Sequence, residues 1–517
     1  MTSSGPNLRP AATTFIRKVH QWKSKATSWV RTHKLSASAS AEPYKRVPST
    51  TVNTPTDATS PIPNTETYEP LKCIYAQLED DDDYVFEMSK DVHTAYKRVD
   101  QKVKPVPGVF PESARVHRRF PEDPLASLAK LPIQPPDFKS NGRLTEERLQ
   151  EMHFNEDGFL WPEEEKLFKH ILQLNQHTLV FEEEHRGTLR EDYFTPYIIP
   201  TVPHIPWAFT NIPIPPGIKD QVIEILKNKI SVGVYEPSQS SYRSRWFCVL
   251  KKNGKLRIVH DLQPLNAVTI RDAGLPPILD SFVEPFAGRQ CYTAFDLHWG
   301  FDARKIHTQS RDMTAFMTPL GLLRLTSLPM GFTNSPAEFQ ACMAFILKDE
   351  MPHIADIFID DLPIKGPLTC YPDEHGNPET LRDNPGIRRF IWEHAHDVHR
   401  IMHRIGHAGG TFSPSKAQIA RREVTILGHK CTPAGRIPDP LTIDKVKNWP
   451  PLKTPKNVRE FLGLCGTARI WIQDYSSRAR PLTELIRQGA TFEWDERRQA
   501  AFEDLKEAIT SASILQL

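Results

Sequence analysis

The sequence predicts an α+β protein, and three observations along the chain support this. From about residue 201, short segments typical of strands and of helices alternate. From about residue 440 the pattern becomes helical. Residues 1–65 are rich in Ser, Thr, Pro and Ala, a composition typical of disorder. We therefore expect a folded region that follows a largely disordered, partly helical N-terminal region.

Composition limits the class of protein. The 65 Lys and Arg residues nearly balance the 63 Asp and Glu residues, so any nucleic-acid-binding surface must come from local clustering. The seven Cys include no Cys-x-x-Cys pair, which argues against a zinc ribbon and indicates free thiols in the cytosol or nucleus. No apolar run reaches the roughly 18 residues of a membrane helix, and no secretory signal is present.

The N-terminal part contains one segment with helical spacing. Its apolar residues alternate with Lys and Arg. Such a basic amphipathic helix binds a membrane surface or nucleic acid, or is a transit peptide, and a solvated helix or coil is the alternative. The acidic run Glu79–Asp83 is expected to be a solvated linker. The apolar residues of the segment are Phe15, Ile16, Val19, Trp22, Ala26, Trp29 and Val30.

Residues 66–200 are predicted to be a Pro-rich spacer with helical segments. Within it, the run His153–Gly158 followed by Glu164 is similar in spacing to a calcium-binding loop. His153 takes the place of the first oxygen ligand, which weakens a site for a hard cation. A capped helix–turn–helix is the alternative interpretation.

A basic hairpin is predicted from Arg243 to Arg257. Phe247–Leu250 and Leu256–Val259 have strand character, and Asn253-Gly254 indicates a type I′ turn between them. The hairpin is either a mobile clamp that places Lys and Arg on phosphates or an ordinary solvated basic hairpin. Its basic residues are Arg243, Arg245, Lys251, Lys252, Lys255 and Arg257.

Three carboxylates lie at the ends of apolar strands. Asp296 closes one strand and is followed five residues later by Phe301. Asp360 and Asp361 lie side by side at the predicted tip of a hairpin, and Pro363 follows, where proline removes a ladder donor. Adjacent carboxylates repel unless a cation neutralises them. The pair is therefore either a metal site or an inert Asp-Asp turn.

The segment Leu328–Gln340 predicts a loop that leads into a helix. Ser335 and Glu338 have the spacing of a capping box, and Pro336 suits the first helical turn, so the helix should run to about Leu347. Further helices are expected at Asp444–Trp449 and from Thr454-Pro455 to Leu464.

In this order, the motifs resemble the reverse transcriptase of gypsy-type LTR retrotransposons, most closely the fungal elements. The resemblance runs from about Thr201 to the C-terminus, and residues 66–200 look like the spacer upstream of that polymerase. The matching motifs are the fingers signature Lys255–Asn266, the catalytic motifs Phe295–Phe301 and Phe358–Asp361, the primer-gripping segment Leu427–His429 and the thumb helix Val458–Leu464.

The resemblance implies a right-hand polymerase, with fingers and palm at 201–435. A helical thumb and the start of a tether to an RNase H-like domain would follow at 436–517. The implied activity is RNA-directed DNA synthesis by two-metal nucleotidyl transfer. Asp296, Asp360 and Asp361 would hold two Mg²⁺ ions, with Mn²⁺ as an alternative, and Asp361 would be the more auxiliary ligand.

The resemblance also implies substrate contacts. Phe301 would leave no room for a 2′-hydroxyl under the incoming sugar, Lys252 or its neighbour Lys251 would bind the triphosphate, and Lys416 would protonate pyrophosphate. The candidate nucleotide contacts are Phe301, Lys252, Arg257, Met330, Gly331 and Lys416. The candidate nucleic-acid contacts are Arg243, Arg245, Lys251, His429, Arg459 and Arg469.

The expected partners are an RNA or DNA template–primer duplex, deoxynucleoside triphosphates, and RNase H and integrase domains that are fused or separate. No membrane partner is expected. The expected location is the cytoplasm, in a virus-like particle, or the nucleus, with a transit peptide as an alternative. The chain is expected to be a polyprotein fragment or a decayed copy. The rival functions are an inactive nucleic-acid-binding protein and an RNA-dependent RNA polymerase, and Phe301 argues against the second.

One further cluster has two interpretations. His396, His399, His403 and His407 share one side of a predicted helix and could bind zinc. An apolar stripe beside them indicates an ordinary amphipathic helix. Structural zinc normally takes ligands from more than one segment, which favours the second interpretation.

Overall fold

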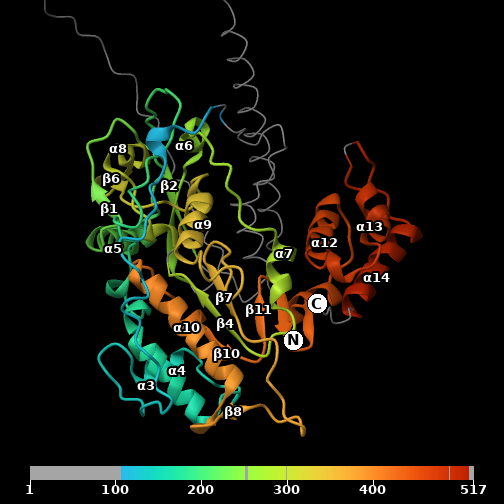
Figure 1. The fold of residues 1–517 in the computed structure, drawn as a ribbon. Coiled ribbons are helices and arrows are strands. Elements are labelled where there is room, and N and C mark those ends of the chain that lie inside the picture. The colour runs from blue at the N-terminus through green and yellow to red at the C-terminus, as the bar shows by residue number, and fades with distance from the viewer. Residues whose placement is uncertain (1–105, 107, 251–253, 299, 488, 512–517) are drawn as a thin grey trace, which may run out of the picture. The chain divides into compact units, whose positions relative to one another are not determined.

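The computed structural model describes residues 106, 108–250, 254–298, 300–487 and 489–511 (Figure 1). The predicted disorder of residues 1–65, the basic helical segment, the acidic run Glu79–Asp83, and the candidate residues Lys251 and Lys252 lie outside the described residues. In the described part of the chain, no helix is both long enough and apolar enough to cross a membrane.

A central antiparallel sheet carries both predicted acid motifs, with the strand order β10–β4–β7. Phe295 and Leu362 point to one face of this sheet, where they join the core built by helices α9 and α10. Tyr292 points to the opposite face and packs with the strands β11 and β12. The sheet is therefore buried on both faces, which explains why its strands are apolar. The bounds are β4 Tyr292–Asp296, β7 Asp361–Lys365, β10 Gln418–Arg421, α9 Ser335–Ile346 and α10 Arg389–His407.

Residues 108–200 pack into this same core. Helix α4 (Pro162–Leu174) lies beside α10 (Figure 1), and its Phe168 is buried among residues of α10 and of the central sheet. A buried ion pair links α4 to the residue just before α10, with Arg388 Nη2 2.6 Å from Glu164 Oε2. The predicted boundary at residue 200 therefore does not mark a break in packing. The short helices of this Pro-rich segment supply apolar residues to the core.

The basic hairpin forms as β2 (Trp246–Leu250) and β3 (Leu256–His260). The pairing runs from Trp246 opposite His260 to Leu250 opposite Leu256. The predicted type I′ turn at Asn253-Gly254 includes Asn253, which lies outside the described residues. Gly254 has a φ of 73°, a conformation that glycine adopts readily.

A second sheet has the strand order β1–β6–β5. The bounds are α5 Lys219–Ser231, β1 Tyr235–Pro237, α6 Gln263–Val268, α7 Leu279–Val283, α8 Thr308–Arg311, β5 Phe316–Thr318 and β6 Gly321–Leu325. Elsewhere lie α3 Glu146–Glu151, β8 Thr380–Leu381 and β9 Asn384–Arg388.

After the central sheet come the three-stranded sheet β11–β12–β13 and then helices with an apolar core of their own. Thr454 caps α12 by accepting a hydrogen bond from the Asn457 N–H, as predicted. The helix predicted at Asp444–Trp449 begins earlier, at Pro440. The bounds are β11 Val424–Ile426, β12 His429–Thr432, β13 Gly435–Pro438, α11 Pro440–Lys447, α12 Pro455–Thr467, α13 Tyr475–Glu484 and α14 Glu496–Thr510.

Candidate active site

Two facing strands bring the predicted catalytic carboxylates together. Asp296 ends β4 and lies opposite Asp361, which begins β7. Phe358 and Asp361 exchange backbone hydrogen bonds of 2.9 and 3.0 Å, so Ile359 and Asp360 form the turn. The prediction that Asp360 and Asp361 form the tip is therefore wrong by one residue. Asp361 is the first residue of β7 and not part of the turn, because it pairs with Asp296 of β4.

The turn has an unfavourable backbone conformation. Ile359 has a φ of 58°, whereas the φ of Asp360 is not positive, and this combination favours glycine at the first position. A β-branched residue there costs about 1–3 kcal/mol and persists only when its surroundings hold it. Gln340 of α9 supplies two such contacts. Its Oε1 accepts from the Ile359 N–H at 2.8 Å, and its Nε2 donates to the Ile357 carbonyl at 2.9 Å.

Pro363 does not interrupt the ladder between β4 and β7. Its carbonyl accepts a hydrogen bond from the Asp356 N–H at 3.3 Å. The nitrogen and the carbonyl of one residue in an antiparallel strand point to the same neighbour. The missing N–H therefore faces the Asp356 segment, and the pairing of Asp361 with Asp296 stays intact.

The carboxylates crowd one another. Burial, followed by the charges of Asp360 and Asp296, raises the pKa of Asp361 to about 6. Burial and the charge of Asp296 also raise the pKa of Asp360. The nearby ammonium of Lys416 lowers both pKa values. Repulsion of this kind favours the binding of a cation.

Lys416 lies beside Asp296, the first of the predicted catalytic carboxylates. Its Nζ is 2.8 Å from Asp296 Oδ2, and its side chain is 64% exposed. Both residues line a cavity of about 220 Å³ between the acid-bearing face of β4 and β7 and the residues that end β11. Its apolar wall includes Pro363 and Leu427. The predicted primer-gripping segment thus borders the acids.

The acids fit a divalent cation by donor type, because hard cations take carboxylate oxygens. No group of three or more His, Cys, Asp or Glu side chains is arranged around a common metal position anywhere in the described ranges. Asp296 and Asp361 are instead a facing pair with Asp360 in the adjoining turn. The three carboxylates would have to converge further to share metal ions.

Phe301, the predicted sugar contact, follows Gly300, and Gly300 lies near this turn. Phe301 belongs to the 3-10 helix Gly300–Ala303, and its ring meets Phe339 of α9 edge to face, with the centroids 5.7 Å apart. Gly300 permits this close packing. A Cβ at position 300 would lie 3.1 Å from the Phe339 ring and 3.7 Å from the Asp360 Cβ.

The loop before α9 joins the basic hairpin. The Arg257 guanidinium contacts the sulfur of Met330, a residue that is 56% exposed. Asn266 fixes the loop, because its Nδ2 donates to the Gly331 carbonyl and its Oδ1 accepts from the Thr333 N–H, each at 2.9 Å. Three predicted nucleotide contacts thus form one surface. Asn266 was not among the predicted nucleotide contacts, although it lies within the motif Lys255–Asn266 that resembles the fingers signature.

The predicted capping box of α9 is wrong. The helix begins at Ser335 with Pro336 in its first turn, but the Ser335 hydroxyl donates to the Pro329 carbonyl at 2.8 Å. Glu338 instead accepts hydrogen bonds from Arg304 and Arg118, each at 2.8 Å. Arg304 is 1% exposed. The ion pair with Glu338 avoids an uncompensated buried charge, and this outweighs the hydrogen bond that the carboxylate would make at the start of the helix.

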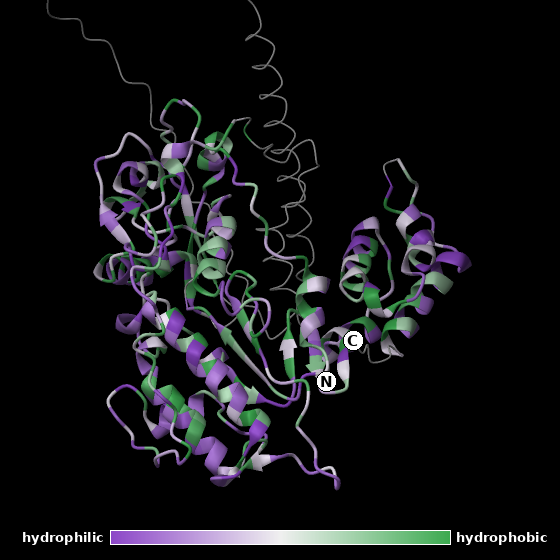
Figure 2. Ribbon diagram, viewed as in Figure 1, coloured by the Kyte–Doolittle hydropathy of each residue, from purple (hydrophilic) through white to green (hydrophobic). Residues whose placement is uncertain are grey.

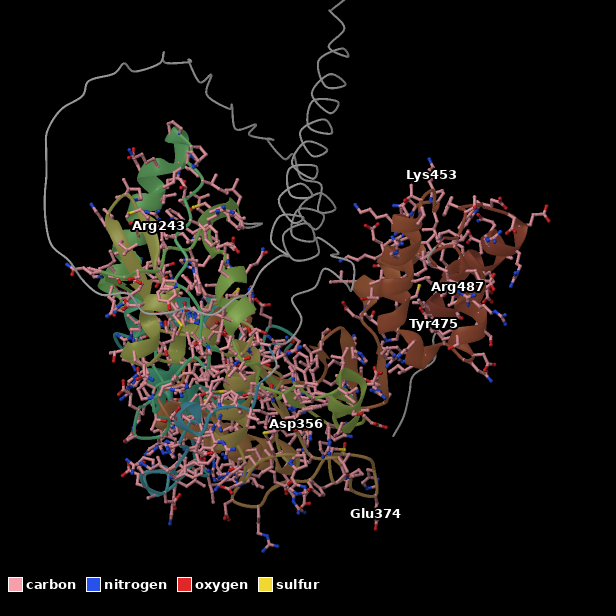
Figure 3. The ribbon with its side chains drawn as sticks, turned by 90° about the horizontal axis from the view of Figure 1, so that it is seen from above. Arg243, Asp356, Glu374, Lys453, Tyr475 and Arg487 are labelled. Atoms are coloured by element: carbon pink, nitrogen blue, oxygen red, sulfur yellow. The ribbon has the colours of Figure 1, made fainter. Side chains whose placement is uncertain are left out.

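The candidate nucleic-acid contacts differ in exposure. Arg243, which is labelled in Figure 3, is half-buried and donates to the Phe209 carbonyl at 2.9 Å. Arg245 is exposed, and its guanidinium lies over the Phe209 ring. Arg459 is exposed on α12. Arg469 is also exposed, and its Nη2 lies 2.9 Å from Asp280 Oδ2. Arg245 and Arg459 are therefore the most available for phosphates.

The structure corrects the prediction that His429 contacts nucleic acid. The residue is 1% exposed, and its ring lies 4.8 Å from the Trp471 ring, centroid to centroid. In β12, His429 pairs with Pro438. His429 therefore does not present its ring to nucleic acid, contrary to the prediction.

The histidine face of α10 has structural partners. His399 bonds to Asn175 and to the Ala129 carbonyl, and His407 bonds to the Tyr193 hydroxyl at 2.6 Å. Along α10, hydrophobic and hydrophilic residues interleave (Figure 2). The amphipathic interpretation is therefore the one that the contacts support.

The possible calcium loop also has structural partners. Glu164, at its last ligand position, is buried against Arg388. Asn155 Oδ1 accepts from the Leu160 N–H at 2.9 Å. Asn155 and Glu164 therefore stabilise the turn before α4. This supports the capped helix–turn–helix interpretation over the calcium loop.

Comparisons with known proteins show what the chain is similar to. The reverse transcriptase (RNA-dependent DNA polymerase) family matches residues 249–431. The Retrovirus-related Pol polyprotein from transposon 412 of Drosophila melanogaster is 29% identical over 305 residues, 58% of this chain and 23% of that polyprotein. The Pol polyprotein of Feline endogenous virus ECE1 is 32% identical over 317 residues, 58% and 27% of the two chains. The Transposon Tf2-3 polyprotein of Schizosaccharomyces pombe is 24% identical over 306 residues, 59% and 21% of the two chains. The chain thus spans about a quarter of these relatives.

Solved structures share the fold. The foamy viral protease-reverse transcriptase in complex with double-stranded DNA matches with a TM-score of 0.62 and 23% identity, over 74% of this chain and 63% of that chain. The same protein in complex with an RNA/DNA hybrid gives a TM-score of 0.60 and 22% identity, over 74% and 48%. The predicted α+β polymerase fold is confirmed. Residues 249–431 of this chain therefore match the reverse transcriptase family, and the chain is similar in sequence to retrotransposon and retrovirus-related Pol polyproteins.

Proposed function

We propose that the chain is an RNA-directed DNA polymerase of a gypsy-type LTR retrotransposon, which extends a primer with deoxynucleotides. The observation that carries this proposal is the facing pair Asp296 and Asp361 with Asp360 in the adjoining turn, inside the matched reverse transcriptase domain. The likeness to the Tf2 polyprotein supports a fungal element.

The three carboxylates are the proposed ligands of two Mg²⁺ ions, with Mn²⁺ as an alternative. The mutual repulsion that raises the pKa of Asp360 and Asp361 supports this assignment, because a divalent cation relieves it. When bound, two such ions stabilise the attacking and leaving oxygens of an in-line displacement at phosphorus.

The surrounding residues have proposed roles. Phe301, packed on Phe339, excludes a 2′-hydroxyl. Arg257 binds the triphosphate from the surface that it forms with Met330. Lys416 donates a proton to pyrophosphate, and its contact with Asp296 supports a place beside the reaction.

The proposed ligand is an RNA or DNA template–primer duplex, with Arg245 and Arg459 among its phosphate contacts. RNase H and integrase domains, fused or separate, are proposed partners, and the Pol polyprotein names of the relatives support them. The proposed location is cytoplasmic, in a virus-like particle, or nuclear. An N-terminal transit peptide is the alternative.

The test is primer extension by the full chain on an RNA template, with deoxynucleotides and ribonucleotides supplied separately. We expect extension with deoxynucleotides and little with ribonucleotides. Preferential use of ribonucleotides would indicate an RNA polymerase. Duplex binding without any extension would indicate the inactive nucleic-acid-binding alternative.

A further inference from the structure

The turn that carries Asp360 is held from two sides. On one side, the Leu297 N–H donates to the Asp360 carbonyl at 2.8 Å. On the other side, Gln340 of α9 contacts the residues immediately before Asp360. The position of Asp360 thus depends on both the central sheet and α9.

The Gln340 amide bonds to two backbone groups of the hairpin. It accepts from the Ile359 N–H at 2.8 Å and donates to the Ile357 carbonyl at 2.9 Å. Gln340 is only 9% exposed, so these hydrogen bonds are shielded from water. The amide therefore spans the residue whose φ is 58° and the strand that leads into it.

The contact also couples the turn to the proposed sugar site. Phe339, the neighbour of Gln340 in α9, packs against Phe301. It also lies within 3.1 Å of where a Cβ of Gly300 would be, and the same Cβ would lie 3.7 Å from the Asp360 Cβ. One turn of α9 therefore contacts both the strained turn and the ring next to it.

We propose that Gln340 is a positioning residue, which keeps Ile359 in its left-handed conformation and so aims the Asp360 carboxylate at the metal ions. This proposal rests on the proposed polymerase function. A misplacement of about 1 Å in a catalytic group costs on the order of 100-fold in rate. We expect Gln340→Leu to lower kcat and to raise the half-saturating Mg²⁺ concentration by about tenfold or more, with the nucleotide KM and the duplex Kd within twofold of wild type.

The decisive variant is the double substitution Gln340→Leu with Ile359→Gly. Glycine adopts a positive φ without steric cost, so the turn should need the amide less. We expect the double variant to recover at least half of the logarithmic loss in Mg²⁺ affinity. Gln340→Glu should show an intermediate loss, because its carboxylate still accepts from the Ile359 N–H but cannot donate to the Ile357 carbonyl.

Met343→Ala is the matched control, because Met343 is buried on the same helix and is 1% exposed. It should lower Tm without changing the Mg²⁺ dependence. Binding of Mn²⁺, followed by electron paramagnetic resonance on the full chain, supplies a readout that does not need catalysis. If wild type binds Mn²⁺ but does not extend primers, the proposed function fails while the role of Gln340 is still measured.

Two results would overturn the proposal. One is a Gln340→Leu variant that loses Tm as Met343→Ala does but binds Mn²⁺ like wild type. The other is a double variant that recovers none of the metal affinity, because the amide would then not act through the conformation of Ile359.

Discussion

Lowering the pH from 7 to 5 should weaken the binding of a divalent cation by about tenfold through Asp361. Burial and the charges of Asp360 and Asp296 raise its pKa to about 6. A carboxyl with that pKa is about 90% protonated at pH 5 and about 10% at pH 7, and only the ionised form binds a hard cation. An ordinary aspartate, with a pKa of about 3.9, stays over about 90% ionised at pH 5.

The same pKa shift affects stability with a defined sign. The folded state binds the proton of Asp361 more tightly than the unfolded state does, because the pKa is raised on folding. The resulting stabilisation is fully present below about pH 4 and is lost as the pH rises through about 6. A bound cation opposes this loss, so stabilisation by metal should grow over the same interval.

The assay is Mn²⁺ titration of the full chain at pH 5, 6 and 7, with the metal-induced rise in Tm as a second readout. Asp383→Asn is the control, because this aspartate is exposed, and it should keep the wild-type profile. Asp361→Asn should bind metal more weakly and show a flatter pH dependence. Equal Mn²⁺ affinity of the wild type at pH 5 and pH 7 would refute the reasoning.

The remaining predictions concern selectivity, affinity and stability. Phe301→Val should lower the preference for deoxynucleotides over ribonucleotides by about tenfold or more, measured as a ratio of kcat/KM values; an unchanged ratio would make Phe301 a core residue only. Arg257→Ala should raise the nucleotide KM about tenfold with little change in duplex Kd, whereas Arg459→Ala should weaken duplex binding and flatten its log–log salt slope by about 0.7–0.9. Glu164→Gln should cost about 3–5 kcal/mol in chemical denaturation, because it leaves a buried arginine uncompensated, whereas the partly exposed Glu163→Gln should cost about 0–1 kcal/mol.

The sequence was sufficient for features that local chemistry determines. Apolar strands around Asp296 and the Asp360–Asp361 pair predicted a sheet, and the structure pairs the two strands in register. The Thr454 cap was also predictable, because a threonine before a proline at a helix start acts within a few residues.

Features that depend on distant partners could not be predicted in this way. Glu338 has the spacing of a capping-box residue, but Arg304 and Arg118 take its carboxylate. His429 lies in a recognisable motif, yet packing against Trp471 buries it. Gln340 carried no local signal, because its contacts lie 17 and 19 residues away in the chain.

The most direct test of the account is single-nucleotide incorporation in Mg²⁺ by the wild type and by Asp360→Asn, with duplex affinity measured on the same samples. Asparagine keeps the size of the side chain and removes the charge that would bind metal. The account predicts that the wild type extends the primer, and that Asp360→Asn binds the duplex with unchanged Kd but fails to extend it. Extension by Asp360→Asn at a rate near that of the wild type would contradict the assignment of these carboxylates as the catalytic centre.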